Sequence, residues 1–312
     1  MLAGTAALEG FAAAHDAARG AAPAAAPAMA DFVADDGEPI RVWRLGAGRP
    51  VLLLHGLTCS HRDWAEAARI LAQSHEVFAW EARSHGPLER RGTDEPGIAR
   101  MARDLDNLIS HFGLRDAVVV GHSMGAAVAL EHLRRFGSAR VAALCLVDHS
   151  PCLVASRGWR FGVRGAALLA RSLRLAAALG ADAGGLALRA LAVACKDVPE
   201  EPRAAAAERD ACARRNMRSL ARILETVLAA DHREVLARID VPVLGVFGGA
   251  SPLYARVPLT RYYAAAIADF RGLTYPGAGH SPHREAPARF AADLAAFIAG
   301  AVAERRARRA AA

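Results

Sequence analysis

The sequence predicts an α/β fold in which a mostly parallel, open sheet is flanked by helices and interrupted by a helical insertion. Two observations carry this prediction. Continuous apolar runs of strand length alternate with segments of helical spacing, which is typical of parallel strands covered on both faces. Between about residues 152 and 239 the strand signal stops, and an Ala-, Leu- and Arg-rich stretch takes its place. The 53% hydrophobic content of the 312 residues is ample for a buried core.

The strands are expected in a regular order, each placed by its own apolar pattern. Residues 40–45 alternate between apolar and polar side chains, as a half-buried strand does. The continuous apolar runs that follow cover residues 51–56, 77–82, 117–122 and 141–149, and two late runs cover residues 241–249 and 272–279. Because these runs lack alternation, they predict strands that are buried on both faces.

Helices are expected between the strands. Their helical spacing covers residues 61–73, 97–113 and 124–137, and a final helix is expected at residues 286–300. The second and third of these segments end at Gly113 and Gly137, and glycine is a common residue just past the last turn of a helix. Strands that alternate with helices in this way favour an open, mostly parallel sheet.

The chain divides into a core, an insertion and two flanking segments. We expect the core over residues 37–151 and 240–300, with a helical lid inserted at residues 152–239. Ligands of open α/β sheets bind beyond the C-terminal ends of the strands, so an insertion at this point is expected to cover the site. An ordinary helical layer without a role in recognition is the alternative. Residues 1–36 are expected to form an Ala/Pro-rich flexible extension, and residues 301–312 a basic tail.

Composition excludes several classes of protein. The formal charge is +7, but Lys196 is the only lysine and the arginines alternate with acids, so a nucleic-acid partner is not expected. No run of 18 apolar residues lacks a charge, so no membrane span is expected. The five cysteines show no CxxC pair, which favours a reducing cytoplasm over a disulfide framework or a zinc site. The first residues lack a basic start, although "APAMA" at residues 26–30 leaves a cleaved signal peptide as the alternative.

The strongest chemical signal is "GHSMG" at residues 121–125, between an apolar strand and a helix. In the Gly-x-Ser-x-Gly elbow, small residues let the chain turn sharply and hold the serine hydroxyl above the sheet. Ser123 is therefore the candidate nucleophile. The alternative is a glycine-rich turn with an incidental serine.

With this motif, the sequence resembles the α/β-hydrolase family over roughly residues 37–300, and "HGLTCSHRDW" at residues 55–64 matches the family's His-Gly turn. The resemblance implies an oxyanion hole made by the backbone N–H groups of Leu57 and Met124, with His55 bracing the loop. It also implies a catalytic histidine in the loop before the last helix. His280 of "PGAGHSPHREAP" occupies that position, and His283 is a competitor beyond Pro282. An imidazole is needed there, because a serine hydroxyl is a weak nucleophile without a base.

The acid of the resemblance lies elsewhere than usual. The customary position after the penultimate strand holds Ser251 in "GGAS", whereas Asp148 ends the strand that follows the nucleophile. Some members of the family place their acid there, so Asp148 is expected to orient His280, with Ser251 hydrogen-bonded nearby. The alternatives are a capping role for Asp148 at the turn into the insertion, and a plain turn residue at Ser251. The segment "EARSHG" matches a family segment that is chiefly structural, which concerns Glu81, Arg83 and His85.

These expectations combine into a cofactor-free, metal-free serine hydrolase that cleaves an ester, thioester or lactone through an acyl-enzyme. Haloalkane dehalogenases and epoxide hydrolases attack with aspartate, so Ser123 disfavours both. The alternatives are a metal-free haloperoxidase activity of the same triad and a non-catalytic receptor or scaffold. The substrate is expected to be a small molecule with an apolar acyl or aromatic group. Candidate pocket residues are Trp159 and Phe161, and an anionic group would suit Arg157, Arg160 and Arg164. The sequence does not indicate an oligomeric state.

Overall fold

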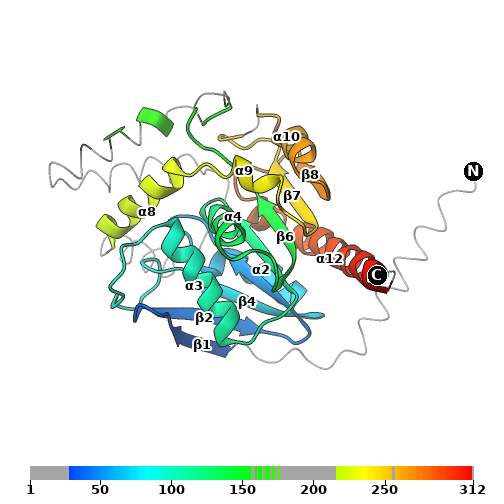
Figure 1. Ribbon diagram of the computed structural model, residues 1–312, viewed down its shortest axis with the longest axis horizontal. Helices are drawn as coiled ribbons and strands as arrows, with labels where there is room; N and C mark the ends of the chain where they lie inside the picture. Colours follow the sequence, from blue (N-terminus) through cyan, green and yellow to red (C-terminus); the bar gives the residue numbers. More distant parts are fainter. Residues whose placement is uncertain are drawn as a thin grey trace, which may run out of the picture.

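The computed structural model describes residues 28–155, 159, 161–163, 166–168, 171, 172, 175, 216–254 and 257–310. Its centre is an eight-stranded sheet in the order β1-β2-β4-β3-β5-β6-β7-β8 (Figure 1). The strands are β1 (Ala28–Val33), β2 (Pro39–Leu45), β3 (Arg49–Leu54), β4 (His75–Glu81), β5 (Ala117–His122), β6 (Val141–Val147), β7 (Val243–Gly248) and β8 (Phe270–Tyr275). Only the pairs β1–β2 and β2–β4 in this sheet are antiparallel. The predicted fold class, an open and mostly parallel sheet, is confirmed.

Strand β1 corrects the predicted extension over residues 1–36. Residues 28–33 pair with β2 in antiparallel register, with Phe32 opposite Ile40. Phe32 is buried, whereas Met29 and Val33 of the same strand are exposed. Because so little of β1 is buried, its own pattern is weak, and pairing with β2 provides the hydrogen bonds that hold it. The remaining part of the predicted extension, residues 1–27, lies outside the described residues.

Helices cover both faces of the sheet. One layer contains the 3₁₀ helix η2 (His61–Trp64), α2 (Ala65–Leu71) and α12 (Pro287–Ala310), and the other contains α3 (Ile98–His111), α4 (Met124–Phe136) and α10 (Leu259–Ala266). Each layer forms its own hydrophobic core with one face of the sheet. The pleat of β3 divides its side chains between the two cores: Val51 and Leu53 belong to the core under α2 and α12, and Leu52 and Leu54 belong to the core under α3 and α4. The final helix continues to Ala310, so residues 301–310 of the predicted basic tail belong to a helix.

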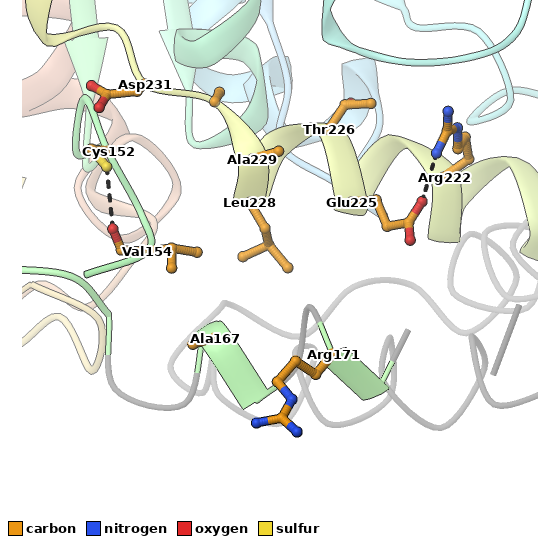
Figure 2. A pocket seen from close by; sticks show the side chains of 11 residues that line it. Cys152, Val154, Ala167, Arg171, Arg222, Glu225, Thr226, Leu228, Ala229 and Asp231 are labelled. Atoms are coloured by element: carbon orange, nitrogen blue, oxygen red, sulfur yellow. Dashed lines mark hydrogen bonds and ion pairs between the residues drawn. The ribbon is translucent and has the colours of Figure 1, made fainter. Parts of the chain in front are cut away.

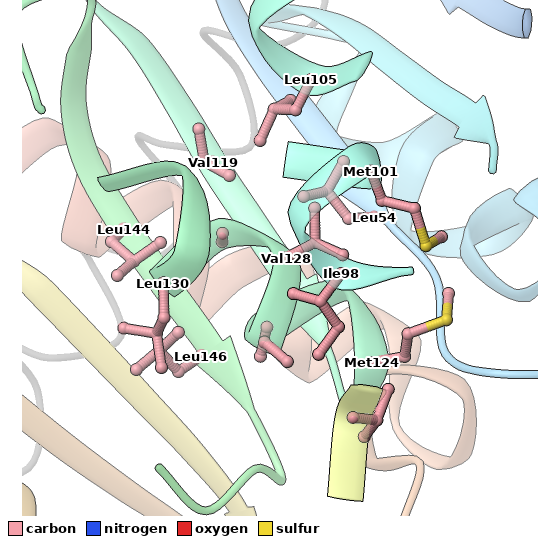
Figure 3. Packing of buried hydrophobic residues seen from close by; sticks show 14 of the residues in the cluster. Leu54, Ile98, Met101, Leu105, Val119, Met124, Val128, Leu130, Leu144 and Leu146 are labelled. Carbon is pink, nitrogen blue, oxygen red and sulfur yellow. The ribbon is translucent and has the colours of Figure 1, made fainter. Parts of the chain in front are cut away.

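The core under α3 and α4 includes residues next to the predicted elbow. In Figure 3, Leu54 of β3 lies with Ile98 and Met101 of α3 and with Met124, the first residue of α4. All four side chains are buried. This close packing fixes the position of the α4 N-terminus relative to the sheet.

The described part of the predicted insertion includes α8 (Met217–Ala229) and the short α9 (Arg233–Leu236). Helix α8 is joined to the start of α3, where the N–H of Ile98 donates to Thr226 Oγ1 over 3.0 Å. The base of the insertion is closed by a β-bridge between Cys152 and Asp231 and by the bond from His232 N–H to Pro151 O, 2.8 Å. Residues 176–215 lie outside the described residues, and a lid function stays a prediction. None of the helices in the described ranges has the length and apolarity needed to cross a membrane.

A buried ion network holds the segment "EARSHG" in place. The guanidinium of Arg83 donates to both carboxylate oxygens of Asp104 on α3, over 2.6 Å each, and to both of Asp36, over 3.0 and 3.1 Å. The Arg83 and Asp104 side chains are fully buried. Glu81 contacts His61 over 2.6 Å, and the ring of His85 lies 4.9 Å from that of His55. These contacts are structural, as the sequence predicts.

Candidate active site

Ser123 lies at a sharp turn between β5 and α4. Its backbone angles are φ 50° and ψ −112°, a conformation in which a non-glycine residue is strained. The flanking glycines are required by space. A Cβ on Gly121 would lie 2.5 Å from the backbone N of Ala126, and one on Gly125 would collide with the carbonyl oxygen of Leu54. The turn therefore holds Ser123 above the C-terminal edge of the sheet, as a nucleophile elbow does.

Asp148 lies at the same edge, one strand away, and is fully buried. Its Oδ2 lies 2.6 Å from Nδ1 of His280 and accepts the Ser251 hydroxyl over 2.7 Å. Its Oδ1 accepts the N–H of Gly248, the last residue of β7, over 3.0 Å. Three donors thus compensate for the buried carboxylate charge. The structure brings together the acid, the histidine and the auxiliary serine that the sequence suggests.

The contact with Asp148 also sets the tautomer of His280. A carboxylate only accepts, so we place the proton of His280 on Nδ1, which leaves the lone pair on Nε2. The ring lies beside the elbow, because His122, the residue before Ser123, lies 4.8 Å from it between ring centroids. An imidazole in this state is able to take a proton from a serine hydroxyl.

The loop that carries His280 is fixed by residues that the sequence analysis does not single out. Glu285 of α11 (Pro282–Glu285) accepts the N–H groups of Gly279 and Ser281, on either side of His280, over 2.8 and 3.2 Å. The sequence signal for Glu285 is weak: an acidic residue in the first turn of a helix that follows the loop.

The predicted oxyanion turn lies against the elbow. A Cβ on Gly56 would lie 2.9 Å from Nδ1 of His122, so the turn and the strand end are in contact. Leu57 follows Gly56, and Met124 is the first residue of α4. Within the described part of the chain, the backbone N–H groups of Leu57 and Met124 have no hydrogen-bond partner. Two such donors beside a nucleophile are suited to stabilise a developing oxyanion by donating hydrogen bonds to it.

Two further histidines have structural surroundings. His55 braces the oxyanion turn: its Nε2 accepts the N–H of Ala82 over 3.1 Å, and its Nδ1 donates to Gly56 O over 2.8 Å. Burial lowers the pKa of His55, which keeps the ring neutral. His283 packs against Trp64 with ring centroids 4.0 Å apart and planes tilted by 35°, and burial holds its pKa well below the ordinary range. Since Asp148 contacts His280 and not His283, the geometry favours His280 as the base.

A cavity of about 610 Å³ lies within the insertion, between α8 and the helical residues 166–168 and 171–172 (Figure 2). Its lining includes Val154, Ala167 and Leu228, and it includes neither Ser123 nor His280. The candidate aromatics Trp159 and Phe161 do not line it either. Trp159 is buried, donates from Nε1 to Cys152 O over 2.7 Å, and packs edge-to-face against Phe161.

Three arginines were candidates to contact an anionic group of the substrate. These residues, Arg157, Arg160 and Arg164, lie outside the described residues. Among the residues that are described, no group of three or more His, Cys, Asp or Glu side chains is arranged to hold a metal ion.

Comparisons with known proteins agree with this fold. Residues 51–293 match the sequence model of the family described as "Alpha/beta hydrolase family". A non-heme haloperoxidase from Rhodococcus erythropolis is 34% identical over 122 residues, 39% of this chain and 44% of that protein, so the match spans less than half of the relative. An esterase from Exiguobacterium antarcticum superposes with a TM-score of 0.73 at 19% identity, over 87% of this chain and 99% of its own. An esterase from Rhodococcus sp. ECU1013 has a TM-score of 0.65 at 25% identity, over 87% and 98%.

Proposed function

The chain belongs to the α/β-hydrolase family, and we propose that it is a cofactor-free serine hydrolase acting on a carboxylic ester, a thioester or a lactone. The observation that carries this proposal is the 2.6 Å contact of Asp148 with His280 beside the strained elbow of Ser123. An acid, an imidazole and a serine are the three groups by which hydroxyl nucleophiles are activated on several unrelated folds.

The reaction proceeds in two halves. In the first, Nε2 of His280 takes the Ser123 proton while Oγ attacks the acyl carbon, and the carbonyl oxygen becomes an oxyanion. The N–H groups of Leu57 and Met124 donate hydrogen bonds to that oxyanion, and removal of one such donor typically costs about 3–4 kcal/mol of transition-state stabilisation. The His280 imidazolium then gives its proton to the leaving alcohol or thiol as the C–O or C–S bond breaks. In the second half, His280 activates water, which releases the acid and restores Ser123.

Asp148 stabilises the imidazolium that forms in both halves. Its carboxylate keeps the proton of His280 on Nδ1, and the Ser251 hydroxyl and the Gly248 N–H hold the carboxylate in place. This arrangement supports the relocated acid, with Ser251 as a partner of the acid and not its substitute.

The substrate proposal is a small molecule with an apolar acyl or aromatic group. The support is that Val154, Leu228 and Ala229 line part of the cavity beside α8, although the lining also includes Arg171 and Asp231 and does not include Ser123 or His280. A panel of p-nitrophenyl esters of increasing chain length measures this preference directly. An optimum at acetate, with no turnover of longer or aromatic acyl groups, would contradict it.

A labelling experiment tests the function itself. A fluorophosphonate probe forms a covalent adduct with an activated serine, and mass spectrometry of the digested protein locates the adduct. We expect one adduct, on Ser123, and none in Ser123→Ala. An unlabelled wild-type protein that still binds hydrophobic esters would instead support a receptor or scaffold.

The haloperoxidase relative provides a second candidate function, a halogenating activity of the same triad. Bromination of a phenol in the presence of bromide, peroxide and a carboxylic acid measures it, because the peracid that forms oxidises bromide to the brominating species. Comparison with ester turnover by the same preparation decides which activity dominates, and we expect ester turnover to be the faster of the two.

A further inference from the structure

We propose that His122 is a positioning residue that holds the backbone of His280 in register with Asp148 and Ser123. The inference rests on the proposed function, because it assigns His280 as the base of that reaction. His122 is the residue directly before the nucleophile, at the end of β5. It is the last residue of that strand, and its side chain is buried.

The contact that carries the inference joins the end of β5 to the loop of His280, which is distant in the sequence. The Nε2 of His122 lies 2.8 Å from the backbone carbonyl oxygen of His280, 158 residues later. A carbonyl oxygen only accepts, so Nε2 of His122 carries the proton and donates. The imidazole of His280 is thus bound at Nδ1 by Asp148, while its own backbone is bound by the residue next to the nucleophile.

The surroundings of His122 keep its ring neutral and in one orientation. Burial holds the pKa of His122 well below its ordinary range, and the neighbouring His283 and His280 lower it further. The ring of His283 lies 4.5 Å away between centroids and itself packs against Trp64. The ring also lies against Gly56 of the oxyanion turn, where an added Cβ would be 2.9 Å from Nδ1 of His122. His122 therefore contacts the elbow, the base loop and the oxyanion turn at once.

The loop needs such a bond because little else fixes the carbonyl of His280. Glu285 accepts the N–H groups of Gly279 and Ser281, which fixes the chain on either side of the base. The carbonyl of His280 points to His122 instead. Without that donor, the peptide between His280 and Ser281 is held only on its N–H side, by Glu285, and a shift of this peptide moves the imidazole away from Asp148. A misplacement of about 1 Å costs on the order of 10²-fold in rate.

Four variants separate this role from simple packing. His122→Leu removes the donor, and His122→Asn keeps a polar side chain that is too short to reach the carbonyl. His122→Gln restores a donor at about the distance of Nε2. His283→Phe is the matched control, because it changes a buried ring that contacts His122 but has no polar contact with His280.

The steady-state readout is ester hydrolysis by the full chain. We expect kcat to fall on the order of 10²-fold in His122→Leu and His122→Asn. KM should stay within about twofold, because a buried side chain does not contact substrate. In His122→Gln, kcat should recover at least about half of the loss, measured on a logarithmic scale. In His283→Phe, kcat should stay within about twofold of the wild-type value.

A second readout does not depend on turnover. The Nδ1 proton of His280, bound to Asp148, gives a far-downfield proton NMR resonance. We expect this resonance to weaken or move upfield in His122→Leu and His122→Asn and to return in His122→Gln. A folded His122→Asn with an unchanged resonance and wild-type kcat would overturn the inference, as would a His122→Gln that stays as slow as His122→Asn. A wild type that shows the resonance but neither ester turnover nor a fluorophosphonate adduct would refute the proposed function, and the resonance in the variants would still decide the role of His122.

Discussion

The hydroxyl group of Ser251 donates to Oδ2 of Asp148 over 2.7 Å, although 103 residues separate them in the chain. Ser251 follows β7, at the position where the family resemblance places the acid, and Asp148 follows β6, the neighbouring strand. The serine therefore contacts the carboxylate that takes the acid's place. Because Oδ2 also contacts Nδ1 of His280, the orientation of this carboxylate determines the position of the base.

Removal of the Ser251 hydroxyl tests how much that contact contributes. Ser251→Ala should lower kcat/KM by about 10- to 100-fold, because a hydrogen bond to a charged carboxylate contributes about 1.5–3 kcal/mol. The Gly248 N–H still holds the other oxygen of Asp148. The measurement is hydrolysis of a p-nitrophenyl ester, with Ser138→Ala as control, since Ser138 precedes the opposite end of β6. A loss near 10⁴-fold would mean that Ser251 is essential to the chemistry, against this account.

The elbow is tested by its glycines. Gly121→Ala places a Cβ 2.5 Å from a backbone nitrogen of α4, so the turn must shift. We expect the free energy of unfolding to fall by about 1–3 kcal/mol, and fluorophosphonate labelling of Ser123 to slow. Gly277→Ala is the control in the same site, because no atom lies within 4 Å of the added carbon. Equal labelling rates in the two variants would contradict the steric role of Gly121.

The buried ion network predicts a large effect on stability. Arg83→Met removes the closer of the two guanidinium partners of the buried Asp104 carboxylate, over 2.6 Å, and leaves Arg100 at 3.1 Å as the other. Such a change is expected to lower the free energy of unfolding by about 3–5 kcal/mol, measured by urea denaturation. The control is Arg69→Met, which removes an exposed ion pair with Glu66 and should cost at most about 1 kcal/mol. Similar losses in both variants would show that burial does not set the contribution of Arg83.

The same network makes stability depend on pH. Burial works to raise the pKa of Asp36, but the hydrogen bonds and charge of Arg83 outweigh it and lower that pKa to about 2. The folded-state pKa is below the unfolded one, so this contribution is fully present above about pH 4 and is lost as the pH falls towards 2. Asp36→Asn should therefore flatten the dependence of unfolding free energy on pH over that range. An unchanged slope would mean that Asp36 titrates equally in both states.

The sheet was predictable where burial on both faces leaves a continuous apolar run. Strands β3, β4, β5 and β6 all lie within the predicted runs or extend one by a residue or two. Strand β1 is different, because Phe32 is its one buried residue and its partner β2 determines its conformation. The end of α12 was placed too early, at Gly300, because a glycine often lies just past the last turn of a helix. Here the helix continues through Gly300 to Ala310.

Within the site, the topology of the sheet made Asp148 predictable. Parallel neighbours end at the same edge, so a carboxylate after β6 must lie close to a serine after β5. The bonds from His122 to His280 O and from the base loop to Glu285 were not predictable. They depend on the direction of single backbone groups in a loop, which no periodicity in the sequence encodes.

The central claim is that Asp148 is the acid of the triad, and one substitution tests it. Asp148→Asn keeps the shape and removes the charge, so the imidazolium of His280 loses its stabilising partner. The exposed Asp240→Asn is the matched control. The measurement is kcat/KM for a p-nitrophenyl ester, with Ser123 labelling in parallel. We expect a loss of about 10⁴-fold in Asp148→Asn, by analogy with the same change in other triads, and none in the control. A fully active Asp148→Asn enzyme would contradict the account.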